Sequence, residues 1–115
     1  MKIRQDKCDI LWSKLVRERD GCCRKCGKKA PYKLDAHHIR PRARANTRYD
    51  LSNGLSLCVH HHRFGEDAVH NVSNQKAWLV EIIGLKEYNR LDKKSLEYKS
   101  RDKARKEFLT HAKKI

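Results

Sequence analysis

Long apolar runs and acidic residues are what this sequence most conspicuously lacks. No stretch of the 115 residues is apolar over the roughly 20 positions that span a bilayer, and we recognise no secretory leader, so we expect neither a membrane anchor nor export. Asp and Glu supply 14 residues against 28 Lys and Arg, which gives a formal net charge of +14. This imbalance favours a polyanionic partner, although charge alone does not separate an enzyme from a packaging protein.

Apolar residues are also scarce, at 38% of the chain against 37% charged residues. A single domain of this length buries only a small core, so we expect a metal to contribute to its stability. No repeat or low-complexity linker divides the chain. We therefore predict one domain over residues 1–115, with an N-terminal helix at 1–21, a core at 22–70 and a basic helical extension at 71–115.

Two pairs of metal-binding side chains share one spacing. Cys23 and Cys26 are separated by two residues, and so are Cys58 and His61. Each pair can reach a single ion from a tight turn, and the two pairs together give a Cys3His set that is typical of structural zinc.

Two alternatives to this set remain at the sequence level. Cys22 can take the place of Cys23, and His60 can take the place of His61, although the two-residue spacing favours the first choice at both ends. Disulfide bonds are disfavoured because the chain carries no export signal, and thiols that are free or metal-bound fit a reducing cytoplasm.

Periodicity and capping residues predict an α+β fold with a two-stranded hairpin, zinc knuckles and flanking helices. Asp6 is the expected N-cap of the first helix, whose apolar stripe includes Cys8 and Trp12 as core residues. The remaining predicted elements are a strand at Tyr32–Ile39, an arginine-rich loop at 40–52, a strand at Gly54–Cys58, a helix that begins near His61 or His62, a helix from Ser73 or Asn74 to Ile83, a short helix around Leu85–Leu91, and a helix at Leu96–Lys113 capped by Ser95.

A second group of polar residues remains once the zinc set is satisfied. His37 and His38 are neighbours in a predicted strand, so their side chains point to opposite faces, and one can bind a metal while the other acts as a base. His62 follows the zinc pair directly and can face the same pocket. Asn53 has an amide that both donates and accepts, which suits it to holding a loop.

His38, Asn53 and His62, in this order and flanked by the two metal-binding pairs, resemble the HNH endonucleases and their ββα-metal fold. The resemblance covers residues 22 to about 70. It implies that His38 is the general base that activates water and that Asn53 braces the loop and the base. It also implies that His37 and His62 hold a catalytic metal. Glu66 or His70 is the further candidate ligand, and the sequence does not choose between them.

The resemblance also sets expectations for cofactors and partners. We expect a structural Zn²⁺ and a catalytic divalent cation, Mn²⁺ or Mg²⁺, with Ni²⁺, Co²⁺ or Zn²⁺ as further candidates. Double-stranded DNA is the expected partner, and four arginines of the 40–52 loop are candidates for phosphate contact: Arg40, Arg42, Arg44 and Arg48.

The pattern is similar to that of small phage-encoded members of the family, which suggests a phage or prophage source and action in the bacterial cytoplasm. One active centre per chain favours a monomer that nicks DNA, with a dimer left open. The competing interpretation is a non-catalytic zinc-binding module that binds nucleic acid. That interpretation leaves His37, His38, Asn53 and His62 unexplained.

Overall fold

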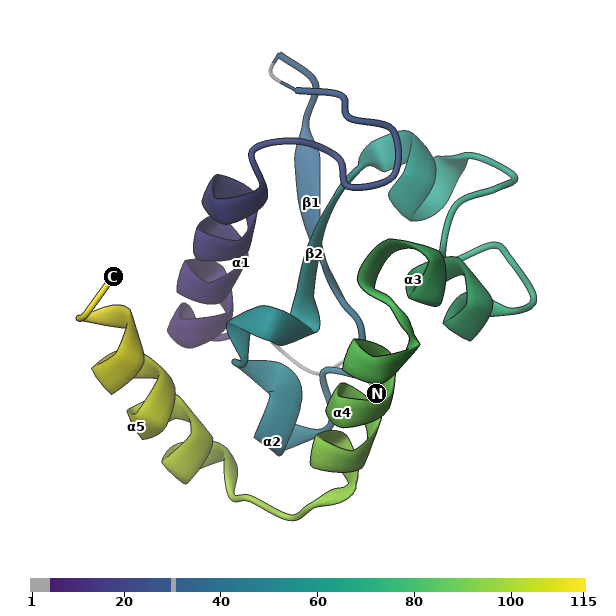
Figure 1. The fold of residues 1–115 in the computed structure, drawn as a ribbon. Helices are drawn as coiled ribbons and strands as arrows, with labels where there is room; N and C mark the ends of the chain where they lie inside the picture. The colour runs from purple at the N-terminus through teal and green to yellow at the C-terminus, as the bar shows by residue number, and fades with distance from the viewer. Residues whose placement is uncertain (1–4, 30) are drawn as a thin grey trace.

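The computed structural model describes residues 5–29 and 31–115. A two-stranded antiparallel sheet of β1 (Leu34–His38) and β2 (Gly54–Cys58) lies at the centre (Figure 1). The helical elements around it are α1 (Lys7–Asp20), α2 (Ala45–Arg48), the 3₁₀ turn η1 (Leu51–Asn53), the π-helical turn η2 (His60–Phe64), α3 (Gln75–Ile83), α4 (Leu85–Leu96) and α5 (Arg101–Ala112). This α+β arrangement, with its hairpin, flanking helices and Cys/His cluster, confirms the predicted fold class.

Two hydrophobic clusters cover the two faces of the sheet. Leu55 and Leu57 of β2 pack with Trp78 and Leu79 of α3 and with Leu91 of α4. On the other face, the cluster is formed by α1 and α5 together with residues near α2. The sheet is therefore the middle layer between α1 and the α3–α4 pair, as Figure 1 shows. Side chains that alternate along β1 consequently face different helices.

The first helix begins and ends as its capping residues predict. The Asp6 side chain accepts a hydrogen bond from the backbone N–H of Asp9, and the Asp9 side chain accepts one from the backbone N–H of Asp6. Gly21 closes the helix with a left-handed φ of 65°. Residues 1–4 of the predicted helix lie outside the described residues.

Close packing, rather than a turn, explains the glycine at the start of β2. A Cβ atom on Gly54 would lie 2.3 Å from Val16 Cγ2 and 2.7 Å from the Trp12 ring. Its φ of −112° is ordinary extended backbone. Gly54 therefore lets α1 lie directly on the sheet, which brings Trp12 to the end of β1.

Several predicted boundaries are wrong. The predicted short helix around Leu85–Leu91 is longer, since α4 continues to Leu96. The first strand is shorter than Tyr32–Ile39, because the Tyr32 N–H bonds to Lys29 O in a turn. The 40–52 segment is not a loop, since it contains α2 and η1. Finally, Ser95 does not cap the last helix: it is buried within α4, where its hydroxyl donates to Asp92 O, and Ser100 caps α5 instead.

Among the described residues, no helix combines the length and the apolar character that crossing a membrane requires.

Candidate active site and metal centres

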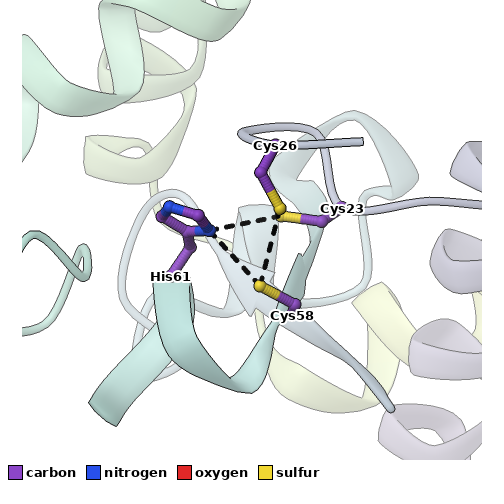
Figure 2. Close-up of side chains that lie close together, drawn as sticks. All are labelled: Cys23, Cys26, Cys58 and His61. Carbon is purple, nitrogen blue, oxygen red and sulfur yellow. Dashed lines mark hydrogen bonds between the residues drawn. The ribbon is translucent and has the colours of Figure 1, made fainter. Parts of the chain in front are cut away.

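Four side chains from three parts of the core converge at one end of the sheet. Cys23 and Cys26 lie in the loop after α1, Cys58 ends β2, and His61 lies in η2 (Figure 2). The sulfur atoms of Cys26 and Cys58 are 3.8 Å apart, and Nδ1 of His61 lies 3.3 Å from Cys58 Sγ and 4.0 Å from Cys23 Sγ. Two thiolates bound to one tetrahedral zinc at ~2.3 Å stand about 3.8 Å apart, so this donor set fits a closed zinc site.

Local backbone geometry prepares this group, which we call the Cys3His group. Gly27 has a φ of 81°, and its N–H bonds to Cys23 O at 2.7 Å, which folds the two cysteines around one turn. Burial opposes ionisation of the Cys23 thiol, but hydrogen bonds from the backbone of Cys58, Cys26 and Lys25 prevail and lower its pKa. A lowered thiol pKa favours the thiolate, which is the form that binds metal.

The geometry separates the alternatives that the sequence leaves open. Cys22 is not part of the Cys3His group. His60 is exposed, and its Nε2 lies 3.1 Å from Asp67 Oδ1 rather than near a cysteine. The same carboxylate comes within 3.6 Å of His61 Nε2, on the side of the ring away from the sulfur atoms. Asp67 therefore stands behind the Cys3His group, and with His60 and His61 it forms a third, more exposed cluster of possible metal donors that shares His61 with that group.

A second group consists of three imidazoles, His37, His62 and His70, and we call it the three-histidine group. One ring nitrogen from each lies within 4.8 Å of the others. The Nε2 atoms of His62 and His70 are 3.1 Å apart. Two imidazole nitrogens at ~2.0–2.1 Å from one tetrahedral metal stand about 3.3 Å apart, so these side chains fit a divalent ion. Glu66 is exposed and lies outside this group, so the geometry favours His70 as the third donor.

Burial keeps the strand histidine of this group neutral. Desolvation, reinforced by the neighbouring His62 and His70, lowers the pKa of His37 to about 3. Burial also lowers the pKa of His62, although a hydrogen bond with Asp35 opposes that shift. Neutral imidazoles are the forms that bind metal, so the group is ready to bind at neutral pH.

His38 points to the opposite face of β1, as alternation along a strand requires. Its ring stacks on Trp12 of α1, with 3.9 Å between ring centroids and 10° between planes. Its Nε2 lies 3.1 Å from Arg48 O. Burial lowers the pKa of His38 to about 4, so the imidazole is neutral at pH 7. The ring is therefore held on one face and at one nitrogen.

The carbonyl that contacts His38 is fixed by a buried ion pair. The Arg48 side chain is 3% exposed. It donates from Nε to Asp9 Oδ1 at 3.0 Å and from Nη2 to Asp9 Oδ2 at 2.6 Å. This bidentate pair ties α2 to α1. It contradicts the prediction that Arg48 contacts DNA, because a guanidinium buried in this way cannot reach a phosphate.

The other predicted arginines differ in their surroundings. Arg40 is held against α4, where Nη1 donates to the Tyr88 hydroxyl at 2.8 Å and Nε lies 3.2 Å from Asp92 Oδ1. Arg44 is exposed at the start of α2, and its side chain makes no capping hydrogen bond. Arg40 and Arg42 both line the cleft described next, so they are the arginines of this segment best placed to meet a substrate.

An open cleft of about 620 Å³ joins the two strand histidines. His37, His62 and His70 line it from one side, and His38 lines it with Trp12 from the other. Three arginines, Arg40, Arg42 and Arg63, also reach its wall. A proton acceptor, a set of metal donors and positive charge thus share one cavity.

Asn53 is fully buried and holds Arg40, which lines the cleft. Its Oδ1 accepts a hydrogen bond from Arg40 N at 2.8 Å, and its Nδ2 donates to Arg40 O at 3.2 Å. Its backbone carbonyl accepts from Ile39 N at 2.9 Å. These bonds pin the chain directly after His38, so the structure gives Asn53 a loop-holding contact and no contact with the three-histidine group.

Sequence reasoning missed Asp35, whose Oδ2 lies 3.0 Å from His62 Nδ1. Asp35 and His37 are two residues apart in β1 and therefore share a face. That alternation was a signal for a carboxylate near the candidate metal ligands.

The sequence model of the HNH endonuclease family matches residues 23–64, which run from the first cysteine of the Cys3His group through η2. No curated protein and no solved structure shows a significant match to the chain. The matched segment contains His38, Asn53 and His62, together with all four members of the Cys3His group. Residues 23–64 therefore match an HNH endonuclease domain, and this match suggests a nuclease-type function.

Proposed function

We propose that the protein is a metal-dependent DNA endonuclease that hydrolyses phosphodiester bonds. The observation that carries this proposal is the cleft in which His38 faces the same space as the three-histidine group. Hydrolysis needs a base for the water and positive charge for the phosphate, and the two sides of the cleft offer one each.

The contacts of His38 determine which of its nitrogen atoms acts as the base. A carbonyl oxygen only accepts hydrogen bonds, so Nε2 must carry the proton that Arg48 O accepts at 3.1 Å. Nδ1 then holds the lone pair and takes a proton from water. Stacking on Trp12 keeps the ring from turning. A neighbouring DNA phosphate raises the basicity of the imidazole, because negative charge favours its protonated form.

We assign His37, His62 and His70 as the residues that hold the catalytic cation, and Cys23, Cys26, Cys58 and His61 as the residues that hold a structural Zn²⁺. When bound, the catalytic cation supplies positive charge for the phosphate and the leaving oxygen. Three neutral imidazoles favour Zn²⁺, Co²⁺, Ni²⁺ or Mn²⁺ over Mg²⁺, which prefers oxygen ligands.

The proposed substrate is double-stranded DNA. The net charge of +14 supports a polyanionic partner, and Arg42 and Arg63 bring part of that charge to the cleft. With one candidate active centre per chain, we propose a monomer that nicks one strand. A phage or prophage source and action in the cytoplasm of a bacterial host remain proposals from the resemblance to small members of the family.

A plasmid assay tests this function. Purified protein is incubated at limiting concentration with supercoiled plasmid and Mn²⁺, Mg²⁺, Co²⁺, Ni²⁺ or Zn²⁺, with EDTA as the control. We expect open circles to accumulate first and linear molecules later. Linear product without a nicked intermediate would contradict the monomer. A gel shift with no cleavage under any metal would support the non-catalytic binding module.

A further inference from the structure

Asp35 lies behind the three-histidine group rather than within it. Its Oδ2 is 3.0 Å from Nδ1 of His62, and the carboxylate is only partly exposed. β1 carries Asp35 and η2 carries His62, so this contact joins the sheet to the turn that follows it. The opposite nitrogen of His62, Nε2, faces Nε2 of His70 at 3.1 Å.

These contacts determine where the proton of His62 lies. An ionised carboxylate can only accept a hydrogen bond, so Nδ1 of a neutral His62 must be the protonated nitrogen. Its Nε2 then carries a lone pair that points toward His70. Nε2 is thus unprotonated, so His62 can coordinate a metal there without moving a proton of its own.

We propose that Asp35 is a positioning residue that fixes His62 in the tautomer and orientation needed to bind the catalytic cation. The proposal deepens the proposed function, since it concerns the same centre. A carboxylate that accepts the distal N–H of a metal-bound imidazole also raises the basicity of the ligand, and loss of such partners costs about 10–100-fold in metal affinity.

Among the described residues, no carboxylate contacts His70 as Asp35 contacts His62. Two bare lone pairs 3.1 Å apart repel, so without an ion the Nε2–H of His70 donates to His62. To bind metal, neutral His70 moves this proton to Nδ1 through solvent, which is a change of tautomer without net proton release. His70 is exposed, so water can carry the proton. His62 is therefore the preset ligand and His70 the adaptable one.

Metal affinity measured apart from cleavage tests the role of Asp35. Protein that retains its structural zinc is titrated with Co²⁺, and binding is followed by calorimetry and by the visible Co²⁺ spectrum. We expect Asp35→Asn to bind Co²⁺ about 10–100-fold more weakly than the parent. Asp35→Glu, which keeps the charge, should recover part of the loss. The matched control is Glu18→Gln, which removes an exposed carboxylate from α1.

Two results would overturn the proposal. One is parental Co²⁺ affinity in Asp35→Asn at unchanged zinc content. The other is absence of any Co²⁺ site beyond the structural zinc in the parent. Nitrogen-15 NMR of the parent without added Co²⁺ gives a readout that does not depend on the folding of variants. We expect His62 to be protonated at Nδ1, and protonation at Nε2 would contradict the proposal that Asp35 fixes its tautomer.

The fate of the proposed function is read separately. If the parent binds Co²⁺ through His62 but cuts no plasmid, the endonuclease proposal fails while the role of Asp35 stands. If the parent cuts plasmid and Asp35→Asn binds metal normally, the reverse holds.

Discussion

The Cys3His group and the three-histidine group both take residues from the short segment Cys58–His62. They differ in the number of donors, in the donor atoms and in their access to the cleft. The first has four donors, three of them sulfur, gathered from a turn, a strand end and η2. The second has three nitrogen donors on the wall of an open cleft. Four protein donors fill the coordination sphere of a tetrahedral ion and exclude substrate from it, whereas three donors leave a coordination position open. Neighbouring residues of one turn can therefore serve structure and chemistry separately.

The surroundings of the two groups differ in the same sense. Backbone N–H groups stabilise the Cys23 thiolate, and Cys58 is buried in the main hydrophobic cluster. The histidines are instead held by side chains: Asp35 contacts His62, and His70 is exposed. We expect the first ion to be held tightly and the second to exchange.

Cys26→Ser should have the largest effect, which is on zinc content and folding stability. Cys26 is exposed, so without a metal its substitution should change the free energy of unfolding by only about 0.5 kcal/mol. As a zinc ligand, it should instead cost the metal and most of the fold, because structural zinc contributes its binding energy to folding. Thermal melts and zinc content measured by mass spectrometry check this. Cys22→Ser, outside the group, is the matched control. Equal melting temperatures of the two variants would contradict a structural zinc at the Cys3His group.

His38→Ala should have the next largest effect, on catalysis alone. Removal of a general base costs about 10²–10⁴-fold in rate. Since the side chain lies outside every candidate metal group of the described residues, zinc content and DNA binding should remain near parental levels. Single-turnover cleavage of plasmid under saturating metal gives the rate. His111→Ala on exposed α5 is the control, and near-parental turnover in His38→Ala would remove His38 from the mechanism.

His62→Ala sharpens the distinction between the two metals. Loss of one of three imidazoles should shift activation by Mn²⁺ or Co²⁺ by at least the ~10–100-fold that outer partners contribute. The structural zinc should stay bound, because His61 and the cysteines are untouched. Cleavage measured against metal concentration, with zinc content in parallel, checks both statements. An unchanged activation curve would mean that His62 is not a ligand.

Local signals account for most of the fold. The bounds of β2 agree with the prediction because its alternating leucines are a local signal. The ends of α1 agree because Asp6 and Gly21 cap the helix through contacts within a few residues. The 40–52 segment was predicted as a loop because α2 is only four residues long and is stabilised by the distant Asp9–Arg48 pair. Ser95 and Ser100 are equally good caps by type, and burial of Ser95 in α4 decides between them.

The candidate site divides in the same way. Pairs separated by two residues predicted the Cys3His group, since the proximity of each pair depends on one turn. His70 follows His62 by eight residues, and its position depends on the path of the chain after Gly65, which no local pattern specifies. Arg48 is a position where the local sequence misleads. The arginine-rich segment favoured phosphate contact, but the side chain is buried in an ion pair with Asp9, 39 residues away.

The smallest expected effect concerns Arg42, one of the arginines that line the cleft. Arg42 borders the three-histidine side of the protein, whereas no cleft-lining residue belongs to the Cys3His group. If DNA lies along this cleft, Arg42→Ala should weaken binding only several-fold and lower the slope of log affinity against log salt by about 0.9, the contribution of one phosphate contact on duplex DNA. Lys86→Ala on exposed α4 removes the same charge away from the cleft and should leave the slope nearly unchanged. Fluorescence anisotropy with a labelled duplex at several salt concentrations and without divalent metal measures both. An equal change in the two variants would mean that DNA affinity depends only on net charge. It would contradict the proposal that DNA lies along the cleft.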